Sequence, residues 1–155
     1  MLSTFTNITP IEEMRGDDEE DTALLQETFP TAENHLSDFR WCLGIRRSFF
    51  GIGVGGIVGV FLFELDPAPE ADSWVWVIAG DIPRAYLEAD AGKNPTEALS
   101  IYCHLMMDWV EAVESGGVLD DVFPVNAPPT AEAAAMLRSR VASLREIFEL
   151  DGAPQ

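Results

Sequence analysis

The chain has 155 residues, of which 27 are Asp or Glu and nine are Lys or Arg, giving a formal net charge of -18. The length suits one domain, and a hydrophobic content of 47% is too high for a wholly disordered acidic chain. The charge argues against partners such as nucleic acids and anionic membranes, while two cysteines without a Cys/His cluster indicate no metal site.

The N-terminal segment ends in five consecutive acids, Asp17 to Asp21, and shows little apolar periodicity. Blocks of like charge repel one another and are commonly solvated. We therefore predict a disordered tail over residues 1–21, followed by a single domain over 22–155. An acidic arm for a basic partner is the alternative interpretation. The segment also lacks the basic start and apolar run of a secretory signal.

Residues 31–49 carry two overlapping patterns. The run Phe29-Pro30-Thr31 resembles a helix start, because Thr can cap a first turn and Pro suits it. Apolar residues then recur at helical spacing, which predicts a helix over 31–49. The same residues alternate with others over 39–46, so a strand there remains an alternative.

Residues 46–63 raise two motif interpretations. Gly51 to Gly56 match the G-x-G-x-x-G spacing of a dinucleotide site, but a strand, and not the required helix, is expected next. Arg46-Arg47-Ser48 precedes fifteen uncharged residues, Phe49 to Phe63, and resembles a twin-arginine export signal. That run is short for a membrane span, which needs about 20 residues. We predict instead a Gly-rich approach to a buried strand.

Two segments rich in Val, Ile, Phe and Trp, 57–65 and 73–80, flank a loop that contains prolines. Since proline interrupts strand pairing, this pattern predicts an antiparallel hairpin, with a short third strand near Tyr86-Leu87. A hairpin alone is marginal in water, so helices must cover one face of the sheet. Trp74 and Trp76 share one face, and we predict them as exposed anchors for a partner.

Helices are predicted over 95–115 and 130–150. Asn94 and Thr130 suit the start of each helix because their side chains can accept an orphan backbone N–H. Gly116-Gly117 ends the first helix. The expected inward residues of that helix are Ala98, Ile101, Tyr102, Leu105, Trp109 and Ala112. The predicted fold class is thus α+β, with a small antiparallel sheet packed against helices.

The charge is uneven along the chain: residues 1–39 carry a net charge of -9, 40–93 of -2 and 94–155 of -7. The acidic surface is therefore expected on the C-terminal helices, more than on the sheet. The predicted partner-binding residues are Trp74, Trp76, Glu97, Asp108, Glu111, Asp120 and Asp121.

The segment from Trp74 to Tyr86 and the segment 124–130 also carry a resemblance. They are similar to small acidic bacterial proteins of uncharacterised function, which have a W-x-V-x-G-D-[IL]-P-x-A-Y segment and a PVN-x-PPT segment before a final helix. The resemblance implies a soluble bacterial protein and transfers no activity or catalytic residue.

The leading hypothesis is a non-enzymatic, acidic protein-binding module of a bacterial cytoplasm. Its specific form is an immunity-type protein that neutralises a basic toxin, because a large negative charge supplies attraction and fast association. A secretion-chaperone-like dimer is the runner-up, so both a monomer and a homodimer stay open. We predict no cofactor.

A small hydrolase or ligand-binding enzyme is the alternative from another class, built on Asp81, Tyr86, His104 and Asp108. His104 and Asp108 are four residues apart on one helix and can touch. The chain contains no H-E-x-x-H, G-x-S-x-G or P-loop pattern. Convergence of the four side chains in a deep apolar pocket would favour the enzyme, whereas scatter and an acidic surface ridge would favour the binding module.

Overall fold

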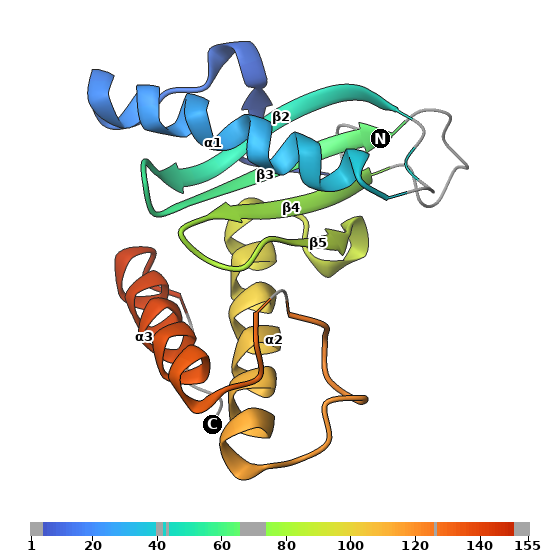
Figure 1. Ribbon diagram of the computed structural model, residues 1–155. Coiled ribbons are helices and arrows are strands. Elements are labelled where there is room, and N and C mark those ends of the chain that lie inside the picture. The colour runs from blue at the N-terminus through green and yellow to red at the C-terminus, as the bar shows by residue number, and fades with distance from the viewer. Residues whose placement is uncertain (1–4, 40–41, 43, 66–73, 126, 151–155) are drawn as a thin grey trace.

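The computed structural model describes residues 5–39, 42, 44–65, 74–125 and 127–150, and Figure 1 shows the arrangement of the elements. Their order along the chain is β1 (Thr9–Pro10), the 3-10 helix η2 (Ile11–Glu13), α1 (Glu19–Ser37), β2 (Ile45–Val54), β3 (Val58–Leu65), β4 (Trp74–Gly80), β5 (Ala85–Glu88), the 3-10 helix η4 (Ala89–Ala91), α2 (Pro95–Ser115) and α3 (Ala131–Ile147).

The strands form one antiparallel meander in the order β1-β2-β3-β4-β5. β3 pairs with all of β4, from Val58 opposite Gly80 to Glu64 opposite Trp74. β5 pairs with β4 as the expected third strand. At the other edge, β1 covers only Phe49 and Phe50 of β2. The α+β class, the hairpin and the short third strand are confirmed.

Helices lie on both sides of this sheet, with α1 on one face and α2 on the other, where α3 packs against α2 (Figure 1). Side chains alternate between two cores, as the two-residue period of a strand requires. In β3, Phe61 and Phe63 join the core under α1, whereas Val60 and Leu62 join the core under α2 and α3. This burial on both faces explains why β3 and β4 are almost continuously apolar.

The helix predicted over 31–49 is wrong, because α1 ends at Ser37 and residues 45–54 form β2. Pro30 does not start this helix and instead lies inside it. The alternative of a strand over 39–46 overlaps with β2 only at residues 45 and 46. Residues 40, 41 and 43 of that segment lie outside the described residues.

The acidic block begins a helix: Glu19 to Asp21 form the first turn of α1, within the segment 1–21 for which the sequence predicts a disordered tail. Asp18 is the N-cap, and its side chain accepts a hydrogen bond from the Asp21 backbone. The acids of the first turn also suit the positive end of the helix dipole. Asp21 reaches further: its carboxylate accepts the backbone N–H of Asp17 at 2.8 Å and that of Gly55, in the β2–β3 turn, at 2.5 Å.

Replacing Asp21 with alanine should therefore loosen the start of α1 from the β2–β3 turn. Both carboxylate hydrogen bonds would be lost, and we expect the free energy of unfolding to fall by about 2 kcal/mol, as for hydrogen bonds to charged groups. Urea unfolding followed by circular dichroism measures this change. Glu20→Ala is the matched control, because Glu20 is an exposed acid of the same turn. Equal effects of the two substitutions would contradict the role of Asp21.

The two C-terminal helices are confirmed, together with their capping residues. Asn94 accepts the backbone N–H of Glu97, and Thr130 accepts that of Ala133. Gly116 ends α2 in the left-handed conformation. Within the described part of the chain, no helix is both long and apolar enough to cross a membrane.

Candidate functional site

The exposed face of α2 carries the residues on which the binding hypothesis depends. Glu97, His104, Asp108 and Glu111 are all exposed, and their spacing of seven, four and three residues places them on one side of the helix. From Glu97 to Glu111 this stripe extends for about 21 Å at the helical rise of 1.5 Å per residue. We call it the acidic face of α2.

The opposite side of α2 is anchored in the core. Its buried residues are Pro95, Ala98, Leu99, Tyr102, Cys103, Met106, Trp109 and Val110. The Tyr102 hydroxyl donates a hydrogen bond of 2.7 Å to the Pro83 carbonyl, in the β4–β5 connection. The prediction that Ile101 points inward is wrong, because its side chain is 37% exposed. The buried side is broader than one stripe, since α2 packs on both the sheet and α3.

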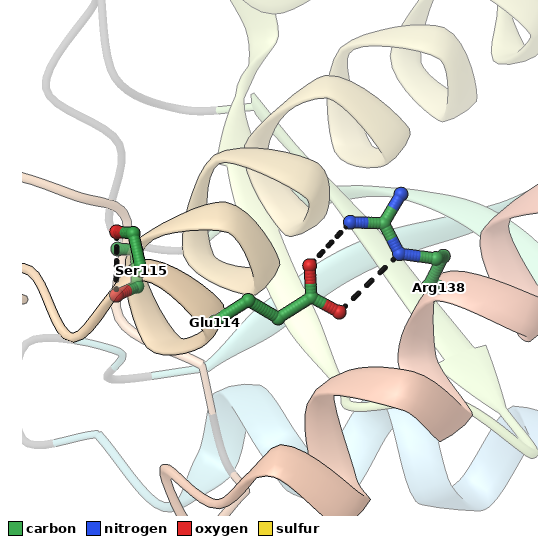
Figure 2. A network of polar contacts seen from close by, with 4 residues as sticks. Glu114, Ser115 and Arg138 are labelled. Atoms are coloured by element: carbon green, nitrogen blue, oxygen red, sulfur yellow. Dashed lines mark hydrogen bonds and ion pairs between the residues drawn. The ribbon is translucent and has the colours of Figure 1, made fainter.

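A salt bridge between α2 and α3 marks the C-terminal end of this face. Figure 2 shows Arg138 of α3 reaching Glu114 with two nitrogens, Nη2 at 2.5 Å from Oε1 and Nε at 3.4 Å from Oε2. Glu114 is thereby neutralised. Glu111, one turn earlier, acts on Arg138 only through its charge. The unpaired negative charge of α2 therefore lies on the N-terminal side of Glu114.

Asp120 and Asp121 lie in the connection between α2 and α3, and both are exposed. Neighbouring apolar residues of this connection, Leu119, Val122 and Phe123, are partly buried against the core. This packing holds the connection against the helices. Asp120 and Asp121 thus belong to the acidic C-terminal region, but to a loop and not to the helical stripe.

Trp74 and Trp76 are not exposed anchors, which corrects the prediction for these two residues. They do share a face of β4, but Phe5 packs against both rings in the core on the α2 side of the sheet, and the two residues are only 7% and 0% exposed. The indole N–H of Trp76 donates a hydrogen bond of 3.0 Å to the Gly92 carbonyl. The expectation failed because both faces of the sheet are covered, whereas the sequence required only one.

The four residues of the enzyme alternative do not converge. Tyr86 packs beside Phe39 on the side of the sheet that α1 covers, whereas His104 and Asp108 lie on the exposed face of α2, across the sheet. Asp81 lies after β4 and pairs with Arg140 of α3 at 3.0 Å. The proposed set of Asp81, Tyr86, His104 and Asp108 is therefore not one site.

The cysteine next to His104 offers no nucleophile either. Cys103 faces the core, and burial raises the pKa of its thiol to about 11. At neutral pH such a thiol stays protonated, and the thiolate is the reactive form. Among the described residues, no group of three or more His, Cys, Asp and Glu side chains could hold a metal ion.

The sequence analysis did not indicate Arg140, which faces the same cavity as Arg84. Arg84 and Arg140 line a cleft between the β4–β5 connection and α3. Arg140 also donates from Nε to the Asp81 carbonyl at 2.8 Å. Asp81 and Arg140 are 59 residues apart, so no local pattern joins them. Burial, and secondly the charge of Arg84, lowers the pKa of nearby His35.

Comparison of the chain with family models, with curated proteins and with solved structures finds no match. The resemblance to small acidic bacterial proteins therefore stays a prediction, and the residues of the surface carry the functional argument.

Proposed function

We propose that the protein is a non-enzymatic binding module whose acidic face of α2 engages a basic protein partner. The specific form of the proposal is an immunity-type protein of a bacterial cytoplasm, which neutralises a basic toxin. The supporting observation is that the ion pairs between described residues use none of the carboxylates of the acidic face.

The ion pairs between described residues use Glu64, Asp81 and Glu114, and none of them uses Glu97, Asp108 or Glu111. Asp108 and Glu111 are three residues apart, a spacing at which like charges on a helix repel. This repulsion opposes helix formation, and no ion pair between described residues offsets it. A basic partner would relieve it, which gives the two acids a role in binding.

The net charge of -18 supports the same proposal through the rate of association. Oppositely charged surfaces steer an encounter over long range and raise the association rate, with a steep dependence on ionic strength. The face is also presented on a firm support, since eight residues of α2 are buried behind it. A rigid, charged helix can bind without paying the ordering entropy of a flexible segment.

The test begins with a pull-down from the native host at low and high salt, to isolate a basic protein that salt displaces. Binding of that purified partner is then measured by stopped-flow fluorescence. We expect the double substitution Asp108→Asn with Glu111→Gln to slow association by about ten-fold at low salt, because steering by the acidic face is lost. The slope of the rate against ionic strength should also decrease.

The matched control is Glu12→Gln with Glu13→Gln, in the exposed η2 segment. It removes the same two charges and leaves the acidic face of α2 unchanged. A similar slowing by both double variants would show that only net charge matters and would contradict a role for this face. Failure to isolate any basic partner that salt displaces would overturn the proposal itself. A stable homodimer held through apolar surface would favour the secretion-chaperone alternative.

A further inference from the structure

A cleft beside Arg84 and Arg140 is a feature that the acidic face does not explain. It lies where the β4–β5 connection meets Thr31 of α1, the short segment 127–128 and the first half of α3. Its volume is about 410 Å³, within the range of roughly 300–1,000 Å³ found for small-molecule sites. No residue of α2 lines it, so it is separate from the acidic face. We call it the α3 cleft.

The walls of the α3 cleft are mainly apolar. Ile82 and Pro83 contribute from the β4–β5 connection, Pro128 from the segment before α3, and Met136 and Leu137 from α3 itself. Met136 is 56% exposed, so its side chain is accessible to a molecule in the cleft. The flexible thioether of methionine adapts to the shape of a bound apolar group.

The charge within the α3 cleft is opposite to that of the whole protein. Arg84 and Arg140 face Asp81 there, which leaves one positive charge in excess. The two contacts of Arg140 with Asp81 use its Nε and Nη2 atoms, while a guanidinium has five N–H donors. Arg84 is exposed and makes no hydrogen bond or ion pair with any described residue. Donors are therefore available on both arginines.

We propose that the α3 cleft binds a small organic monoanion with an apolar body. The acid group lies at Arg84 and at the remaining donors of Arg140, because guanidinium groups bind carboxylates and sulfonates through paired N–H donors. The apolar body lies along Pro83, Met136 and Leu137. One negative charge matches the one positive charge in excess. A polyanion such as a nucleotide would exceed it and would meet the negative field of the rest of the protein.

A fluorescence titration with 8-anilinonaphthalene-1-sulfonate tests this proposal on the full, folded chain. The probe has an aromatic body and one sulfonate, and its neutral analogue N-phenyl-1-naphthylamine has the same body without the charge. We expect saturable binding of one sulfonate probe per chain. Arg84→Gln should weaken it by about ten-fold, as the loss of a charge-assisted contact implies, and should change binding of the neutral analogue by less than two-fold.

Two further variants separate the cleft from other surfaces. Met136→Gln should weaken binding of both probes, because it makes the apolar wall polar. Arg138→Gln is the control, since Arg138 lies on the same helix but pairs with Glu114 outside the cleft. Unchanged affinity for the sulfonate probe in both Arg84→Gln and Met136→Gln would overturn the site. Equal losses for the two probes in Arg84→Gln would overturn recognition of the anion.

A measurement on the unmodified protein keeps the proposal independent of how the variants fold. In a ¹H–¹³C and ¹H–¹⁵N NMR titration, the sulfonate probe should shift the Met136 methyl signal and the amide signals of Ile82 and Arg84. The amides of Asp108 and Glu111 should stay in place. Shifts confined to other parts of the chain, or binding that never saturates, would overturn the proposal.

Discussion

Replacing Trp76 with alanine is expected to lower the free energy of unfolding by about 4 kcal/mol, as for large aromatic side chains removed from a core. Trp76 has no exposed surface, and its indole ring packs edge-on against Phe5 with centroids 5.8 Å apart. The substitution would also leave the Gly92 carbonyl without the indole N–H. Since domains are commonly stable by only about 5–15 kcal/mol, the variant should be close to unfolding at 25 °C in equilibrium urea titrations.

Trp76→Phe separates packing from hydrogen bonding. Phenylalanine keeps an aromatic ring between the sheet and α2 but cannot donate to Gly92, so we expect a smaller loss of about 2 kcal/mol. If Trp76 were instead an exposed contact for a partner, both substitutions would leave stability unchanged within about 0.5 kcal/mol, as at ordinary surface positions. Unchanged urea midpoints for both variants would therefore contradict the burial of this residue.

The hairpin and the two C-terminal helices could be predicted because their signals are local. The residues of β3 and β4 form short apolar runs separated by prolines, and the expected bounds differ from the observed ones by one residue. For α2, the cap at Asn94, the apolar spacing and the glycine at 116 all lie within the helix or next to it. None of these signals requires knowledge of what packs against the element.

The elements of the first third were mispredicted because contacts with distant parts of the chain, and not local sequence patterns, determine them. α1 buries only Leu25, Ala32 and Leu36 among its 19 residues, which is too sparse for a clear apolar stripe. Its acidic start is held by the Gly55 backbone, 34 residues away from Asp21. β2 contains Gly51 and Gly53, which resemble a loop in isolation. Pairing with β3 is what places them in a strand.

In the candidate site too, some features could be predicted from local sequence patterns and others depend on the tertiary structure. The acidic face of α2 follows from helical periodicity alone, so Glu97, Asp108 and Glu111 lie where the sequence placed them. The shared face of Trp74 and Trp76 follows from strand alternation. Their exposure depended instead on how many helices cover the sheet, which no local pattern reveals. Arg84 and Arg140 have no periodic signal at all, and only the fold brings them to one cleft.

Gly80 is the glycine at which substitution should cost the most. It ends β4 with a positive φ of 140°, a conformation that only glycine adopts readily. A Cβ added there would lie 2.4 Å from the Ile57 carbonyl oxygen and 2.8 Å from the Cα of Val58. That same carbonyl accepts the backbone N–H of Asp81 at 3.0 Å. The obstacle is therefore backbone, which cannot move aside as the end of a side chain can.

We expect Gly80→Ala to lower the free energy of unfolding by about 3 kcal/mol or more, since strain of the residue itself costs about 1–3 kcal/mol and displacement of the β3–β4 pairing adds to it. Gly116→Ala is the matched control in urea unfolding. Gly116 also has a positive φ, 71°, but a Cβ there would meet nothing within 4 Å, so only the strain of about 1 kcal/mol remains. Because both substitutions add one methyl group at a positive φ, the difference between them measures the steric conflict with Ile57 and Val58. Equal losses of stability would mean that the end of β4 does not approach the Ile57 carbonyl as closely as described.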